Sequence, residues 1–149
     1  MNTLDLDTML VEWQCQALVT RSMNLLDKGC WQALSQCYTD EAVLFRPSAP
    51  SVPIQGREAI LKSFIARPLK ETCHALSNME VSVLNNETAI VTSRVVLFSG
   101  EEKAHSIESV VLAKSDVYIG RFTDELKKVE GKWLISKRQG SIELNYKGV

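Results

Sequence analysis

The chain contains two histidines, and one of them, His74, lies where an imidazole could act as a base. The surrounding segment, TCHALSNMEV, alternates in polarity with a period of two, which is typical of a β-strand and places His74, Leu76 and Asn78 on one face. A neutral imidazole can accept a proton near physiological pH, so His74 is a candidate general base. A histidine on a strand can equally be a hydrogen-bonded core residue, and its spacing leaves both interpretations open.

A histidine base needs a partner that fixes its tautomer and stabilises the imidazolium, and a carboxylate does both. Asp27 is the candidate partner because it follows the apolar pair Leu25-Leu26 at the end of a predicted helix, close to Gly29. An acid at that position can also be an ordinary helix-end residue. No spacing rule brings Asp27 and His74 together, since they are remote in sequence.

The remaining reactive residue types predict no further chemistry. His105 sits in the charged segment GEEKAHS and is expected at the surface. The four cysteines, Cys15, Cys30, Cys37 and Cys73, form no C-x-x-C pair and have no histidine at metal-ligand spacing. We therefore expect no metal site and four small, reduced thiols that fill the core.

Helical periodicity dominates the first third of the chain, which must position Asp27. Val11, Cys15, Leu18 and Leu25 form an apolar stripe that Trp13 and Ala17 widen, with Asp7 or Thr8 as N-cap and Gly29 as C-cap.

A short second helix should carry Trp31, Leu34 and Tyr38 on one face and end at 39–41, before a strand at 42–45. The proline-rich segment 46–53 predicts an irregular loop that could shape a cavity mouth, and a third helix is expected from Arg57 to about Ala66.

From Thr72 onward the period changes to two, which predicts the strand that must carry His74. Strands are expected at about 72–84, 87–98, 105–129, with a break near 114–116, and 132–145, with tight turns at Asn85-Asn86 and 130–132. Because this antiparallel run follows the helices instead of alternating with them, the fold class is α+β, with a curved sheet wrapped on helices.

Composition limits the classes of function. A length of 149 residues, with 45% hydrophobic and 23% charged residues, suits one globular domain spanning 1–149. A net charge of −1 without a basic run argues against binding to nucleic acid. No apolar stretch is long enough to span a membrane, and the acidic start MNTLDLDTML is unlike a signal peptide, so a cytoplasmic location is expected.

Several motifs occur in an order and spacing that resemble a known family. They are the acid after two apolar residues, the W-x-x-L and D-E-A segment, the G-R-E-A helix start, the strand histidine and the terminal G-K-W-x-I-x-x-R strand. Over residues 8 to 145 the chain resembles the SnoaL-like branch of the nuclear-transport-factor-2-like superfamily, and within it scytalone dehydratase and hexachlorocyclohexane dehydrochlorinase. The resemblance implies a cone-shaped, cystatin-like fold, with a mixed or antiparallel sheet around three N-terminal helices. It also implies a catalytic dyad in which His74 is the base and Asp27 the orienting acid.

At some positions the chain differs from the pattern of the family. Ser22 stands where the dehydrochlorinase has a lysine, and Arg94 and Arg121 are the candidates for its pocket arginine. Tyr38 and Tyr118 are available phenols. The expected wall of the substrate cavity consists of Met23, Tyr38, Leu44, Leu76, Val95, Tyr118 and Phe122.

Together these features predict a cofactor-independent lyase that removes a proton from carbon of a small cyclic or polyketide-like substrate. The reaction would be a dehydration, a dehydrohalogenation or a related isomerisation. The alternatives are a non-catalytic small subunit of an aromatic-ring-hydroxylating dioxygenase, whose C-terminal segment GRFTDELKKVEGKWLISKR is similar, and a small-molecule-binding domain. In each case family resemblance predicts a homo-oligomer, a dimer or a trimer.

Overall fold

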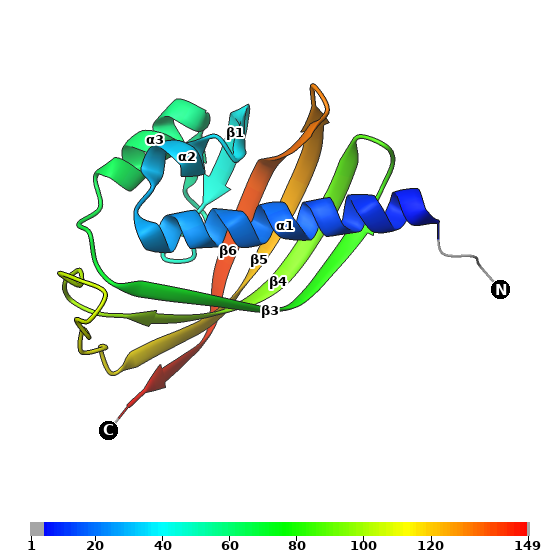
Figure 1. The fold of residues 1–149 in the computed structure, drawn as a ribbon. Coiled ribbons are helices and arrows are strands. Elements are labelled where there is room, and N and C mark those ends of the chain that lie inside the picture. Colours follow the sequence, from blue (N-terminus) through cyan, green and yellow to red (C-terminus); the bar gives the residue numbers. More distant parts are fainter. Residues whose placement is uncertain (1–4, 149) are drawn as a thin grey trace.

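The computed structural model describes residues 5–148, which form three helices and a six-stranded mixed sheet that curves without closing (Figure 1). The elements are α1 (Leu6–Lys28), α2 (Trp31–Ser35), β1 (Tyr38–Phe45), β2 (Pro53–Gln55), α3 (Arg57–Ile65), β3 (Thr72–Val83), β4 (Thr88–Ser99), β5 (Asp116–Val129) and β6 (Lys132–Lys147). The strand order is β2-β1-β6-β5-β4-β3, with β1 and β6 parallel and every other pair antiparallel. The predicted α+β class and cone-shaped sheet are confirmed.

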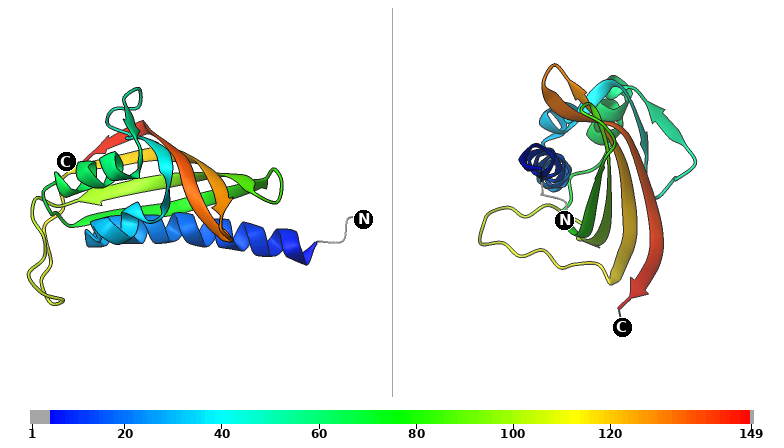
Figure 2. Two further views of the ribbon diagram at one scale, coloured as in Figure 1. Left: turned by 90° about the horizontal axis from the view of Figure 1, so that it is seen from above. Right: turned by 90° about the vertical axis from the view of Figure 1, so that its right-hand side faces the viewer.

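Helix α1 lies across the concave face of the sheet, which curves around it (Figure 2). Its N-cap is Asp5, whose side chain accepts a hydrogen bond from the Asp7 backbone N–H, so the predicted cap at Asp7 or Thr8 was two or three residues late. Gly29 ends the helix at φ 70°, a left-handed conformation that glycine adopts without a Cβ penalty. This cap ends the helix at Lys28, one residue after Asp27.

The buried side of α1 differs in part from the predicted stripe. Cys15, Val19, Ser22, Met23 and Leu25 are buried against the sheet. Trp13 is 66% exposed and Ala17 is also exposed, so the prediction that they widen the apolar face was wrong. Both lie on the opposite side of the helix, which faces away from the sheet.

The second helix is shorter than predicted. It ends at Ser35, and Tyr38 begins β1 instead of closing the helix. The predicted strand at 42–45 therefore starts four residues earlier. Pairing with β6 in parallel, at Tyr38 opposite Ile135, outweighs the local helical spacing of Trp31, Leu34 and Tyr38.

The predicted strand 105–129 was too long at its start. Strand β5 begins at Asp116, and residues 101–115 form a long connection from β4 with one isolated bridge, Gly100 to Ala113. Figure 2 shows this connection extending away from the sheet. His105 lies in it and is exposed, as predicted. The proline-rich segment is irregular up to Pro53, which opens the unpredicted edge strand β2.

Two β-bulges change which residues face the concave side. In β3, Asn78 and Met79 together oppose Ser93, and Asn78 has φ 49°. His74 and Leu76 share the inner face as predicted, but Asn78 is exposed and Met79 takes the next inward position. In β6, Ser136 is an extra residue between Ile135 and Lys137, so the inward series Trp133, Ile135 continues at Arg138.

The core fills the space between α1, α2, α3 and the concave face of the sheet. Cys15 and Cys37 belong to it, whereas Cys30 and Cys73 are exposed, so only two of the four thiols fill the core as predicted. Among residues 5–148, no helix has both the length and the apolar character needed to cross a bilayer.

Candidate active site

His74 and Asp27 meet at the point where α1 ends against β3. Nδ1 of His74 lies 2.5 Å from Oδ1 of Asp27, and the His74 backbone N–H donates to Oδ2 at 2.9 Å. The Thr72 hydroxyl donates to Oδ1 at 2.7 Å. The side chains of His74 and Asp27 are 13% and 22% exposed. The left-handed cap at Gly29 and the edge strand β3 thus bring together two groups that are distant in sequence.

The carboxylate of Asp27 is held in its charged form by these contacts. Partial burial by itself raises its pKa, but the hydrogen bonds from the His74 ring, the His74 backbone and Thr72 lower it, and the net pKa is below the ordinary value of 3.8. An ionised Asp27 accepts a hydrogen bond from Nδ1–H, so the neutral His74 ring carries its hydrogen on Nδ1 and presents the lone pair of Nε2.

We expect Asp27 to stabilise the fold in a pH-dependent way. A folded-state pKa below the unfolded value gives a contribution that is present above about pH 3.8 and is lost as the pH falls through the folded-state pKa. Urea unfolding at intervals from about pH 6 down to about pH 3 should show a steeper loss of stability in the parent than in Asp27→Asn. Asp40→Asn, which removes an 85% exposed carboxylate, is the matched control and should keep the parent's slope. If the free energy of unfolding fell equally steeply with pH in the parent and in Asp27→Asn, Asp27 would not be the source of this pH dependence.

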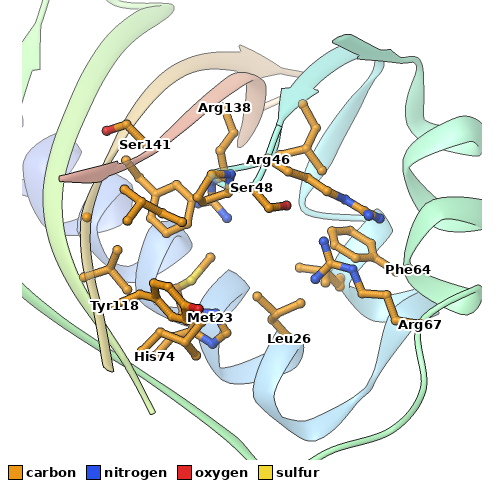
Figure 3. Close-up of a pocket in the computed structure, with 18 of the residues that line it drawn as sticks. Met23, Leu26, Arg46, Ser48, Phe64, Arg67, His74, Tyr118, Arg138 and Ser141 are labelled. Atoms are coloured by element: carbon orange, nitrogen blue, oxygen red, sulfur yellow. The ribbon is translucent and has the colours of Figure 1, made fainter. Parts of the chain in front are cut away.

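A cavity of about 580 Å³ opens beside the His74 ring, within the range of small-molecule sites (Figure 3). Its wall is mostly apolar and draws on all three helices and five of the six strands. Six of the seven side chains expected in the wall line it, namely Met23, Tyr38, Leu44, Val95, Tyr118 and Phe122. Leu76 lines a neighbouring hollow of about 260 Å³ that also reaches His74. Pro47 and Ser48 of the proline-rich loop contribute to the rim of the cavity.

Arg138 supplies a buried charge to the cavity wall. It is 2% exposed and forms a bidentate pair with the fully buried Asp124, through Nε to Oδ1 at 2.7 Å and Nη2 to Oδ2 at 3.0 Å. Nη2 also donates to the Ser22 hydroxyl at 2.9 Å, and the guanidinium lies 5.1 Å from the Phe122 ring centre. Burial disfavours the charge of Arg138, but Asp124 outweighs it and raises the pKa of Arg138 above its ordinary value. Figure 3 shows Arg138 and His74 entering the cavity from different walls.

Arg138 is therefore not one of the two arginines considered from the sequence. Arg94 and Arg121 both pair with Glu143, at 2.9 and 3.1 Å, on the outer side of the sheet. Strict alternation from Trp133 and Ile135 would point Lys137 inward and Arg138 outward. The bulge at Ser136 reverses that parity, and no local sequence signal marks it.

Two more arginines missed by sequence reasoning, Arg46 and Arg67, line the cavity on the side of α3 (Figure 3). They lie in a proline-rich loop and at the end of a helix. In such segments the hydrophobic period does not predict the direction of a side chain. Among the described residues, no group of three or more histidine, cysteine or acidic side chains is arranged to hold a metal ion.

Comparison with known proteins shows which family and which fold the chain is similar to. The family model described as "SnoaL-like domain" matches residues 7–139. No curated protein sequence matches the chain.

Solved structures with the same fold include a protein assigned as a scytalone dehydratase from Novosphingobium aromaticivorans DSM 12444. It is 20% identical, with a TM-score of 0.76, over 96% of this chain and 91% of that one. The hexachlorocyclohexane dehydrochlorinase LinA, type 2, is 18% identical, with a TM-score of 0.79, over 97% and 93% of the two chains. A protein of unknown function with a cystatin-like fold from Nostoc punctiforme PCC 73102 is 18% identical, with a TM-score of 0.70, over 96% of both chains. At these identities the likeness establishes the fold.

Proposed function

Because the chain belongs to the SnoaL-like domain family, we propose that it is a cofactor-independent lyase that removes a proton from carbon of a small cyclic substrate. The observation that carries the proposal is the His74 imidazole, mostly buried, joined to Asp27 at 2.5 Å and lining an apolar cavity of about 580 Å³. A base with a fixed tautomer at a cavity wall is what general-base catalysis requires. Structural neighbours assigned as a dehydratase and a dehydrochlorinase agree with this class of reaction.

In the proposed dehydration, Nε2 of His74 takes the proton next to a carbonyl. The electrons of the broken C–H bond move onto the carbonyl as an enolate and then form the new C=C bond as the C–O bond breaks. The departing hydroxide takes the proton back from the imidazolium and leaves as water, which restores neutral His74. Asp27 stabilises the imidazolium between these steps without accepting its proton. Dehydrohalogenation or isomerisation would begin with the same proton transfer.

Arg138 is proposed to stabilise the negative charge that develops on the substrate oxygen or on the leaving group. Its guanidinium is held by Asp124 and Ser22, so it needs little reorganisation when charge appears nearby. Ser22 stands where the resemblance to the dehydrochlorinase would place a lysine, and it accepts a hydrogen bond from Arg138. The apolar wall excludes water and strengthens this interaction.

A panel of cyclic ketones, with and without a β-hydroxyl group, tests the proposal. Proton abstraction predicts that the protein exchanges α-hydrogens of suitable ketones for deuterium in D₂O, seen by NMR, and converts β-hydroxy ketones to enones, seen by their absorbance. Exchange needs only the base and not the leaving group, so it tests His74 before the substrate is known. Ketones that bind without exchange or dehydration would favour the binding-domain alternative. Co-purification with a large oxygenase subunit, again without exchange, would favour the small-subunit alternative.

A homo-oligomer and a cytoplasmic location remain predictions. The outer face of the sheet carries exposed Phe98, Leu144 and Tyr146, together with the Glu143 ion pairs. Such a face is compatible with association of two or three copies.

A further inference from the structure

The cavity wall is unusually rich in positive charge. Its 19 lining residues include three arginines, Arg46, Arg67 and Arg138, and a histidine, but no aspartate or glutamate. Figure 3 shows Arg46 and Arg67 on the same side of the cavity, with Phe64 beside them. Arg46 follows the last residue of β1, and Arg67 follows the C-cap of α3. Two guanidinium groups from different segments therefore converge at one end of an otherwise apolar space.

These two charges differ from the side chains of Arg138 and His74 because no acid pairs with them. Asp124 pairs with Arg138, and Asp27 pairs with His74. Within residues 5–148, neither Arg46 nor Arg67 takes part in a salt bridge. Both residues are partly buried, and a charge that is partly withdrawn from water is favoured by an opposite charge nearby.

The hydrogen bonding of the two side chains is also incomplete. Nη2 of Arg46 donates to the Ser63 carbonyl at 2.7 Å, but its Nε is buried without any partner in the described part of the chain. The Arg67 guanidinium lies over the Phe64 ring, 5.1 Å from its centre. That contact leaves the guanidinium N–H groups of Arg67 available as donors, and within residues 5–148 none of them forms a hydrogen bond.

The charge of Arg67 is further disfavoured by burial and by the nearby charge of Arg46. Burial lowers the pKa of Arg67 to about 10, with a further contribution from the charge of Arg46. Burial likewise lowers the pKa of Arg46. An anion between them would relieve the mutual repulsion and supply acceptors for the unused N–H groups, since guanidinium matches carboxylate and phosphate oxygens well.

We propose that Arg46 and Arg67 form an oxyanion-binding subsite, so that the substrate carries a carboxylate or phosphate group on an apolar body. Arg67 and His74 both also line a second hollow of about 240 Å³, so the subsite and the base lie around one continuous region. That the bound anion is a substrate rests on the proposed function, whereas the binding of an anion at this subsite does not. A ligand bound in this way would have its apolar body against the wall beside His74.

Binding to the full chain can be measured by isothermal titration calorimetry with three probes of similar shape: benzoate, phenyl phosphate and benzamide. The subsite predicts that at least one of the two anions binds at least about tenfold more tightly than neutral benzamide, and that this preference weakens with added salt. The stronger of the two anions identifies which oxyanion the subsite prefers. Equal binding of all three probes would overturn the proposal.

Single substitutions locate the subsite. Arg67→Gln and Arg46→Gln should each weaken binding of the preferred anion by about tenfold or more without changing that of benzamide. Arg121→Gln is the matched control, because it removes an arginine from the outer side of the sheet and should leave all three affinities unchanged. Arg46 also donates a hydrogen bond to the Ser63 carbonyl, which Arg46→Gln removes. If that variant fails to fold, Arg46→Lys tests whether a positive charge alone at this position supports anion binding. Anion binding that survives Arg67→Gln at full strength would place the anion elsewhere.

The same titration separates this inference from the proposed reaction. The preference for an anion over benzamide is measured on the parent protein without any turnover, so the subsite can be established even if no ketone undergoes exchange. Conversely, exchange of neutral ketones without any preference for anions would support the base and refute the subsite.

Discussion

Replacing His74 by glutamine should reduce the rate of α-hydrogen exchange, and of any dehydration, by about 10²–10⁴-fold. Glutamine has a similar reach but no basic nitrogen, so substrate can still enter while the proton has no acceptor. The thermal unfolding midpoint should fall only modestly, because Asp27 loses the hydrogen bond from the ring but keeps those from the His74 backbone and Thr72. Rates of deuterium incorporation measured by NMR, with unfolding followed on the same samples, give both quantities.

The other histidine provides the matched control. His105 is exposed in the 101–115 connection, so His105→Gln should keep the full rate. Asp27→Asn should also lower the rate, because an amide no longer enforces the Nδ1–H tautomer. If Asp27 acts through His74, the double variant should be no slower than His74→Gln alone. A His74→Gln protein that still exchanges ketone hydrogens at the parent rate would refute the proposed base.

Replacing Arg138 by methionine should destabilise the protein by about 3–5 kcal/mol, because it leaves the fully buried Asp124 carboxylate without a partner. The Ser22 hydroxyl loses its donor in the same variant, although it keeps its own bond to the Val19 carbonyl at 2.6 Å. Urea unfolding at neutral pH measures the change in the free energy of unfolding. We expect this to be the largest effect of any single charge removal in the cavity wall.

Arg121→Met is the matched control for this experiment. Arg121 is 43% exposed and pairs with Glu143, so removing it should cost less than about 1 kcal/mol. The double variant Arg138→Met with Asp124→Leu should recover most of the lost stability, since apolar residues of similar volume can replace a buried ion pair. It should not recover activity if Arg138 stabilises developing charge. Equal costs for Arg138→Met and Arg121→Met would show that the buried pair has no special role in stability.

The sequence predicted helices and strands correctly wherever hydrophobic periodicity and capping or turn residues within one element decide its structure. The long first helix, its end at Gly29, the third helix and the four long strands could all be predicted from these signals, and so could the α+β class. Errors occurred where pairing across the sheet outweighed local preference. Tyr38 joined β1 beside β6 instead of ending a helix, and the segment before Asp116 gained no strand partner beyond one bridge.

In the candidate site, too, local sequence signals suggested single residues, whereas the contact between them depends on the tertiary structure. His74 was visible as a lone histidine on the inner face of a strand, and Asp27 as an acid at a helix end, but only family resemblance suggested that they pair. Their 2.5 Å contact depends on how α1 crosses the sheet, which is a tertiary property.

The three arginines of the cavity could not be placed from the sequence at all. Arg138 faces inward because of the single extra residue at Ser136, since a one-residue shift moves the side chains that follow it to the other face of the sheet. Arg46 and Arg67 lie outside any periodic element, so only the packing of α3 against β1 decides that they meet. Period and composition thus determined which elements form and which face is apolar. The polar chemistry of the cavity was decided by long-range contacts, because charged groups are oriented by partners that are distant along the chain.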